Sequence, residues 1–297
     1  MNISRSIPCG LFSEQVDVVL RDICRDINYS SPNKEIARKT AFGLQCLSGW
    51  RELPEWIHSA ELHVLEGEIK LNLCTDNADV TLADLEKAAD GIQDDLSSLF
   101  SYKTRPFPNK VFCIGWSKTG TVSLTEALRM LGIFSRHFTP WIIGATYFDS
   151  DVSETAINFS SIADYTSVSD VPVCALFREL DQTFPGSKFI LTTRPPESWI
   201  ESAVLQHESL IERQGIMDPA SRWVYGTDQI DRQLFLNRYL QHHQQVLEYF
   251  KYRSDLLAID IAEDNQWQKL CDFLNLPIPD CPFPYLNRRA VSNNINL

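Results

Sequence analysis

Short apolar runs alternate with helical patterns over the C-terminal two thirds of the chain. Residues 111–114, 188–192 and 256–259 are apolar runs, and each is followed by apolar positions at helical spacing. Strands that alternate with helices are typical of βαβ units, in which helices cover both faces of a parallel sheet. The pattern therefore predicts an α/β fold with a parallel sheet flanked by helices.

A change of pattern divides the chain into two parts. Residues 1–103 alternate helical and polar stretches and contain no recognisable chemistry. Residues 103–109 include two prolines, which favour a linker over a regular element. We therefore predict a mainly helical N-terminal region over residues 1–103, which is a cap or a packing surface for a second copy of the chain, and a separate domain over residues 104–297.

Local patterns predict three elements in the N-terminal region. Apolar positions at helical spacing indicate an amphipathic helix over residues 13–27. Thr81 and Asp84 form a start signal for a second helix. Apolar residues that alternate with polar ones around Gly67 predict a small hairpin in residues 63–74.

Composition and charge exclude several classes of protein. The 297 residues are 44% hydrophobic and 22% charged, which is ordinary for a globular protein and excludes general disorder. A net charge of −12 argues against nucleic acid as a partner, because such binding depends on Lys and Arg contacts to phosphates. No apolar stretch reaches the roughly 20 residues of a membrane span, and no secretory signal is recognisable, so we expect a cytoplasmic protein. The eight cysteines show no metal-ligand spacing.

The most informative segment is a predicted strand, loop and helix over residues 110–132, KVFCIGWSKTGTVSLTEALRMLG. A loop of small residues before a helix presents several backbone N–H groups to one point, where the helix dipole also favours an anion. Lys118 adds a mobile cation, and Thr121 or Ser123 adds a hydroxyl donor. The alternative is an ordinary turn whose polar residues cap the helix.

The order of residues in this loop differs from two common nucleotide-binding motifs. The ATP-binding loop has its lysine directly after the second glycine, whereas Lys118 precedes Gly120. The dinucleotide pattern G-x-G-x-x-G does not fit either. Asp260, at the end of an apolar run, has the place of a magnesium-holding acid in an NTPase, but the missing ATP-binding loop disfavours that interpretation.

A second junction between a strand and a helix lies at residues 188–202, KFILTTRPPESWIES. Arg194 ends the apolar run, two prolines start the helix, and Ser202 follows eight residues after the arginine. A guanidinium at the carboxyl edge of a sheet can bind two phosphate oxygens, and such edges are where open α/β sheets bind ligands. Taken alone, Arg194 would more often be a surface ion-pair residue.

Together, the two junctions resemble the donor-binding elements of the sulfotransferase family. The motif GxxKTGTxSLxxALxxLG resembles that family's 5′-phosphosulfate loop, and Arg194 with Ser202 resembles its 3′-phosphate element. The resemblance extends from Lys110 to about Asn287 and implies a P-loop-like sulfotransferase fold, 3′-phosphoadenosine 5′-phosphosulfate (PAPS) as sulfuryl donor, and no metal. The residues that it assigns to the donor are Ser117, Lys118, Thr119, Gly120, Thr121, Val122, Ser123, Arg194 and Ser202.

Two departures from the family pattern concern the outer contacts of the donor. Ser123 stands where cytosolic members that modify steroids and phenols have a tryptophan that stacks on adenine. The closing RKG-type segment of those members, another 3′-phosphate contact, is also missing. Arg288 and Arg289 are the only basic residues near the end of the chain that could substitute for it.

The chemistry of sulfuryl transfer requires a cation and a base. The group passes in line between two oxygens, and Lys118 is the candidate to stabilise the charge that develops on the leaving phosphate. The resemblance implies a base some two dozen residues before the strand arginine, which is the place of Asp170. Asp170 is also well placed to cap a helix, and His137 and His207 are rival bases. Candidates to line the acceptor site are Trp116, Trp141 and Tyr147.

The leading hypothesis is a sulfotransferase that acts on a hydroxyl or amine of a small molecule. The negative net charge disfavours a polyanionic acceptor and leaves neutral or cationic ones. A P-loop nucleotide kinase or NTPase, and a sulfotransferase-like binding protein without activity, are the alternatives.

Overall fold

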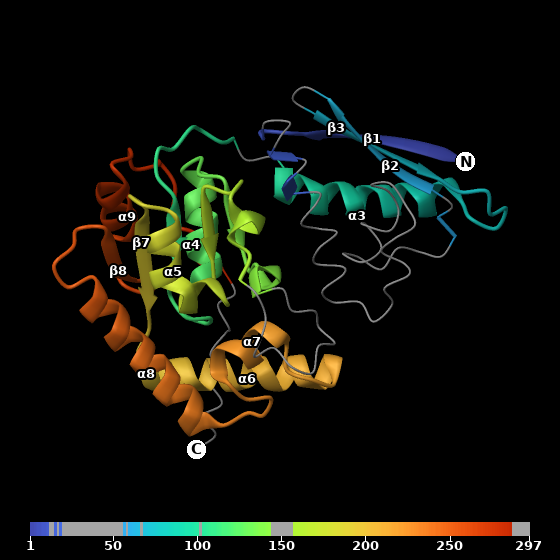
Figure 1. The fold of residues 1–297 in the computed structure, drawn as a ribbon. Helices are drawn as coiled ribbons and strands as arrows, with labels where there is room; N and C mark the ends of the chain where they lie inside the picture. Colours follow the sequence, from blue (N-terminus) through green and yellow to red (C-terminus); the bar gives the residue numbers. More distant parts are fainter. Residues whose placement is uncertain are drawn as a thin grey trace, which may run out of the picture. The chain divides into compact units, whose positions relative to one another are not determined.

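The computed structural model describes residues 1–11, 15–16, 18–19, 56–57, 59–65, 68–100, 103–143 and 157–286. The chain divides into two compact units, which Figure 1 shows as ribbons. Unit 1 comprises Met1–Pro106, Gly132–Phe134 and Pro140–Asp164. Unit 2 comprises Phe107–Leu131, Ser135–Thr139 and Tyr165–Leu297.

Unit 1 contains a three-stranded antiparallel sheet and a helix. Strand β3 (Glu68–Cys74) lies between β1 (Asn2–Pro8) and β2 (Ser59–Leu65), and α3 (Leu82–Phe100) packs against β1. The β2–β3 pair confirms the predicted hairpin. The short helices η2 (Pro140–Ile143) and η3 (Phe159–Ile162) also belong to this unit.

The start of α3 confirms the predicted signal. The Thr81 N–H donates to Asp84 Oδ2 at 3.0 Å, and the Asp84 N–H donates to Thr81 Oγ1 at 3.2 Å. Strand β1 was missed, because Ile3 and Ile7 are its only large apolar residues and their spacing does not show a strand. Most of the predicted helix over residues 13–27 lies outside the described residues.

Unit 2 confirms the parallel sheet flanked by helices. Its five strands run parallel in the order β5-β6-β4-β7-β8. The strands are β4 (Val111–Cys113), β5 (Ser135–His137), β6 (Ser167–Ser169), β7 (Lys188–Thr193) and β8 (Leu256–Asp260). The helices are α4 (Thr121–Met130), α5 (Phe177–Thr183), α6 (Pro196–Gln214), α7 (Pro219–Tyr225), α8 (Arg232–Tyr249) and α9 (Gln266–Leu274), with the short helix η4 (Val173–Leu176) before α5.

Local sequence explains where the two helices of the predicted junctions begin and end. Helix α4 buries a stripe that includes Leu124, Ala127 and Leu128. Helix α6 begins at Pro196, where the missing N–H of proline costs nothing, and ends at Gln214, before the cap residue Gly215 with φ 79°. Helices α6 and α7 lie beneath the sheet in Figure 1, with α8 running past them.

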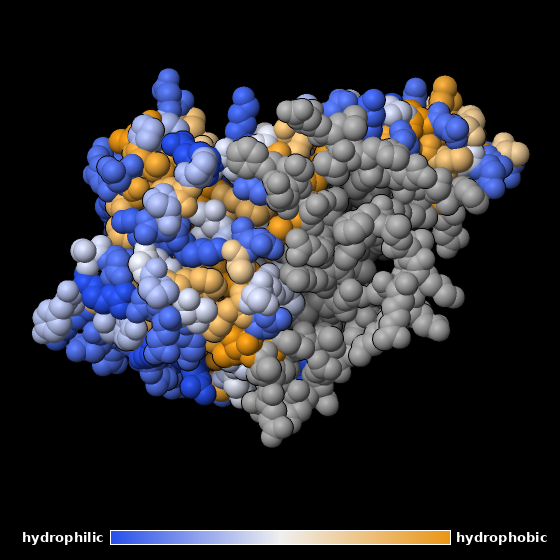
Figure 2. All heavy atoms as spheres, turned by 45° about the horizontal axis from the view of Figure 1, so that its top comes forward, coloured by the Kyte–Doolittle hydropathy of each residue, from blue (hydrophilic) through white to orange (hydrophobic). Residues whose placement is uncertain are grey.

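The surface and the cysteines add little chemistry. Hydrophilic residues cover most of the coloured surface in Figure 2, and hydrophobic residues interrupt it in places. No helix among the described residues is long and apolar enough to cross a membrane. The six cysteines that the structure describes are all unbridged, and burial raises the pKa of the Cys113 thiol to about 12.

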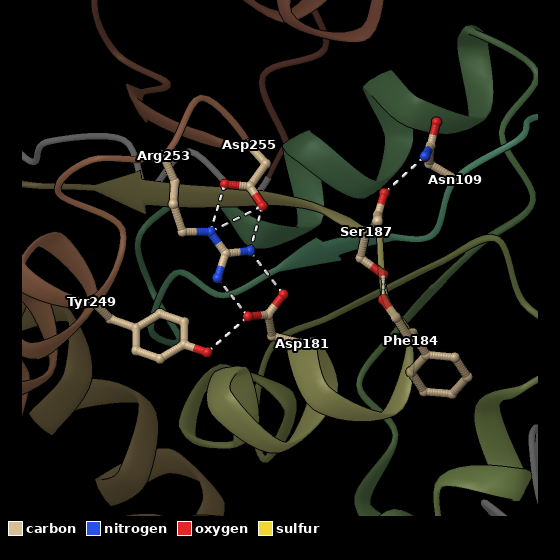
Figure 3. A network of polar contacts seen from close by, with 8 residues as sticks. Asn109, Asp181, Phe184, Ser187, Tyr249, Arg253 and Asp255 are labelled. Carbon is tan, nitrogen blue, oxygen red and sulfur yellow. Dashed lines mark hydrogen bonds and ion pairs between the residues drawn. The ribbon is translucent and has the colours of Figure 1, made fainter.

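A network of ion pairs lies at the amino-terminal edge of the parallel sheet (Figure 3). Arg253, before β8, binds both carboxylate oxygens of Asp181 in α5 and those of Asp255, and Tyr249 donates to Asp181 at 2.7 Å. The hydrogen bond from Arg253 is the main cause that lowers the pKa of Asp181 from 3.8. The network therefore ties α5, α8 and β8 together on the side away from the predicted site.

We predict that Asp181→Asn lowers the free energy of unfolding at pH 7 by about 1–3 kcal/mol, because it removes a charged hydrogen-bond partner of Arg253. A folded pKa below 3.8 means that the stabilisation is complete above that value and is lost as the pH falls through the lowered pKa. Urea melts from pH 7 to pH 2 should show the two proteins converge in acid. Equal stability at pH 7, with exposed Asp264→Asn as control, would contradict the prediction.

Candidate active site at the carboxyl edge of the parallel sheet

The predicted site residues of unit 2 follow the carboxyl ends of neighbouring strands. Lys118 lies in the loop after β4, and Asp170 directly follows β6. His137 is the last residue of β5, and Arg194 follows β7. Because parallel strands align their carboxyl ends, side chains from four separate parts of the sequence meet at one edge.

We call residues 115–120, between β4 and α4, the lysine loop. A Cβ on Gly115 would lie 1.8 Å from Thr192 Oγ1, so only glycine lets this loop pass so close to β7. Gly120 has φ 97°, and a Cβ there would lie 2.8 Å from Ile261 Cγ1. Lys118 is also left-handed, with φ 71°, a conformation that is costly for a residue with a Cβ and that clusters at functional sites.

The lysine loop leads into a helix start without a side-chain cap. Gly120 is the N-cap residue of α4, and no described side chain caps this end. The first backbone N–H groups of an α-helix have no partner within the helix and favour an anion. Thr119 faces inward instead, because its hydroxyl bonds Trp116 O at 2.6 Å and Thr192 Oγ1 at 2.5 Å.

One stripe of α6 contacts both predicted cations. Ser198, Ser202 and Gln206 are spaced by four residues and therefore share a helix face. Arg194 Nε donates to Ser198 Oγ at 3.1 Å, and Lys118 Nζ donates to Gln206 Oε1 at 3.3 Å. Ser202 lies between these two contacts on the helix. Ser198 and Gln206 were not predicted as site residues, although the polar spacing along α6 is visible in the sequence.

Two donors from the Arg194 segment bind successive carbonyls of the lysine loop. Arg194 Nη1 donates to Lys118 O at 3.2 Å, and Trp199 Nε1 donates to Ser117 O at 2.8 Å. Earlier in the lysine loop, Trp116 Nε1 donates to Tyr225 OH at 2.9 Å. The two predicted donor-binding elements are thus connected by direct hydrogen bonds.

Asp170 and His137 form a pair. His137 Nε2 lies 3.0 Å from Asp170 Oδ2 and 3.1 Å from Thr121 Oγ1. A carboxylate only accepts, so Nε2 carries the proton in this contact. The side chain of Asp170 is 8% exposed, its Oδ1 has no hydrogen-bond partner, and its φ is 73°.

The geometry does not support the interpretation of Asp170 as a helix cap. The N-cap residue of η4 is Pro172, and no side chain caps this short helix. The Asp170 side chain points to His137 instead. A buried carboxylate oxygen without a donor is costly, so these two features keep Asp170 a candidate for a functional role.

His207, the other rival base, lies on α6 within an aromatic environment. Its ring packs edge-on against Tyr225 and Phe235, with centroid distances of 5.3 and 5.2 Å. Burial lowers the pKa of His207, and the nearby charge of Lys118 lowers it further, against the opposing effect of Asp218. The ring is therefore predominantly neutral at pH 7.

The remaining candidates lie in varied places. Trp116 belongs to the apolar core of unit 2, and Trp141 belongs to unit 1. Asp260 Oδ1 accepts the Ala262 N–H at 2.8 Å, as a turn residue does. Among the residues that the structure describes, no group of three His, Cys, Asp or Glu side chains could bind a metal. The candidates outside the described residues are Tyr147, Arg288 and Arg289.

Comparison with known proteins shows the family of this chain. The sulfotransferase domain family matches residues 110–292, more than half of the chain. A relative from Aspergillus versicolor, described as Ava biosynthesis cluster protein M, is 25% identical over 210 residues, which cover 60% of this chain and 80% of the relative. The chain belongs to the sulfotransferase domain family.

Proposed function

We propose that this protein is a PAPS-dependent sulfotransferase that transfers a sulfuryl group to a hydroxyl or amine of a small molecule. The observation that supports it best is the direct link between the lysine loop and Arg194 beside an uncapped helix start. A donor with a 5′-phosphosulfate and a 3′-phosphate presents two anionic groups. The α4 start with Lys118 suits the first group, and Arg194 with Ser198 and Ser202 suits the second.

The reaction requires one bond to form and one to break at sulfur. The acceptor atom bonds to sulfur, and the bond from sulfur to the bridging oxygen breaks, so that its electron pair stays on the leaving phosphate. Lys118 stabilises this charge, and Gln206 keeps the amine within the site before the donor binds. The acceptor's proton moves to Asp170 Oδ1.

In this scheme His137 is a positioning residue and not a rival base. Its Nε2–H occupies Asp170 Oδ2 and leaves Oδ1 as the oxygen that can accept a proton. Thr121, in the first turn of α4, contacts the same ring nitrogen. The proposed base is thereby connected to the helix that binds the 5′-phosphosulfate.

The acceptor is proposed to be neutral or cationic. The negative charges of Asp170 and Asp218 both act to raise the pKa of His207, so they lie near this ring. A net charge of −12 also repels polyanions. A nucleotide kinase or NTPase is disfavoured, because Lys118 precedes Gly120 and Asp260 is engaged with Ala262. A binding protein without activity would have no need for a strained, buried Asp170, so product formation is the discriminating test.

We predict that Lys118→Ala lowers turnover at least a hundredfold, with a smaller loss of donor binding, because its charge matters most in the transition state. Transfer from labelled PAPS to an acceptor library measures turnover, and calorimetry measures binding. Lys269→Ala, which removes a surface ion pair with Glu263, is the control. Turnover near that of the wild type would remove Lys118 from the mechanism.

We predict that Arg194→Ala weakens binding of adenosine 3′,5′-bisphosphate roughly tenfold or more, because a charged hydrogen bond is worth about 1.5–3 kcal/mol. Binding of adenosine 5′-monophosphate should fall less, because it loses only the support that Arg194 gives to the lysine loop at Lys118 O. Arg232→Ala, which removes an exposed ion pair between α8 and Glu201 of α6, is the matched control. If the wild-type protein binds both nucleotides equally well, Arg194 does not recognise a 3′-phosphate.

We predict that Asp170→Asn retains its melting temperature and donor binding but loses turnover at least a hundredfold, in the range typical of a general base. The side-chain oxygen of the asparagine can accept the hydrogen bond from His137. Its NH2 group then stands where Asp170 has the oxygen that would accept the proton. Asp231→Asn, at the cap of α8, is the control for an ordinary capping role. His137→Asn should lower turnover less than Asp170→Asn does; the reverse order would make His137 the base.

A further inference from the structure

The hydroxyl of Tyr239, in α8, binds both the backbone N–H and the backbone C=O of Arg194. Its hydroxyl accepts from the Arg194 N–H at 3.2 Å and donates to Arg194 O at 2.7 Å. The side chain is buried, with 2% of the residue exposed. Burial raises the pKa of Tyr239 to about 12, so the hydroxyl keeps its proton and can donate.

The ring of Tyr239 also supports the second contact to the lysine loop. It stacks on Trp199, with a centroid distance of 4.1 Å and an angle of 10° between the planes. Trp199 in turn donates to Ser117 O. One tyrosine therefore contacts both residues that bind the carbonyls of the lysine loop.

Arg194 needs such support because regular structure ends on either side of it. Strand β7 stops at Thr193, and Pro195 precedes α6, so this peptide lies between a strand and a helix. Its N–H and C=O lack the partners that a strand or helix would supply, and the peptide is half-buried. The Tyr239 hydroxyl supplies both and fixes the main chain from which the guanidinium extends to Ser198 and Lys118 O.

We propose that Tyr239 is a positioning residue for Arg194, and that its hydroxyl sets the preference of the site for a nucleotide with a 3′-phosphate. The inference rests on the proposed function, in which Arg194 binds that phosphate. Tyr239 acts through the placement of Arg194 and does not contact the donor itself. A guanidinium that is fixed in advance loses less conformational freedom when it binds an anion.

The test compares the affinities of adenosine 3′,5′-bisphosphate and adenosine 5′-monophosphate by calorimetry in Tyr239→Phe. This variant removes the two hydrogen bonds to Arg194 and keeps the ring. We expect the affinity ratio of the two nucleotides to fall roughly fivefold or more, because binding of the bisphosphate weakens more than binding of the monophosphate. In an Arg194→Ala background the same change should have no further effect on the ratio, because Tyr239 acts through Arg194.

Tyr249→Phe is the matched control. Tyr249 belongs to the same helix, but its hydroxyl bonds Asp181 in the network of Figure 3. Loss of the Tyr249 hydroxyl should lower the melting temperature and leave the affinity ratio of the two nucleotides unchanged. An unchanged ratio in Tyr239→Phe, or an equal loss for both nucleotides, would overturn the inference while the proposed function stands. A wild-type protein without preference for the 3′-phosphate would overturn both.

Discussion

The geometry of the site depends on the hydrogen bonds to the carbonyls of the lysine loop. Lys118 has a left-handed backbone, which a lysine does not adopt without compensation. Arg194 and Trp199 supply that compensation by donating to Lys118 O and Ser117 O. Since both donors come from the segment after β7, the element proposed for the 3′-phosphate also shapes the loop proposed for the 5′-phosphosulfate.

The proposed base depends on a different set of neighbours. Strands β5 and β6 pair in parallel with His137 opposite Ser169, which brings Asp170 beside the His137 ring. Thr121 joins this pair to the first turn of α4. The proposed base and the proposed anion site thus share one helix start, and a shift of α4 would disturb both. Such coupling is a reason to expect effects on turnover from changes that do not touch the donor.

Much of the fold, and less of the site, could be predicted from the sequence. Apolar runs predicted β4, β7 and β8, and glycines and prolines marked the loop and helix starts, because these signals are local. Strands β5 and β6 were not predicted, because they have three residues each and most of these are polar. The contacts of Gln206 and Tyr239 join residues 88 and 45 positions apart, and no local pattern shows them. Ser198 lies only four residues after Arg194, so its contact was within reach of a local pattern. The pairing of Asp170 with His137 needed the sheet register, so the sequence left them as rivals. The roles of these residues in transfer stay predictions.

Ser123 shows where this chain departs from members that stack adenine on a tryptophan. The serine is buried, with 2% exposed, and its hydroxyl accepts the Leu286 N–H at 2.9 Å. An indole at this position would displace the segment that ends the described chain, because the two cannot occupy the same space. The adenine of a donor therefore needs another surface, even where its phosphates meet the lysine loop and Arg194. We therefore expect the likeness to the family to hold for the residues proposed to bind the phosphates and not for those that would contact adenine.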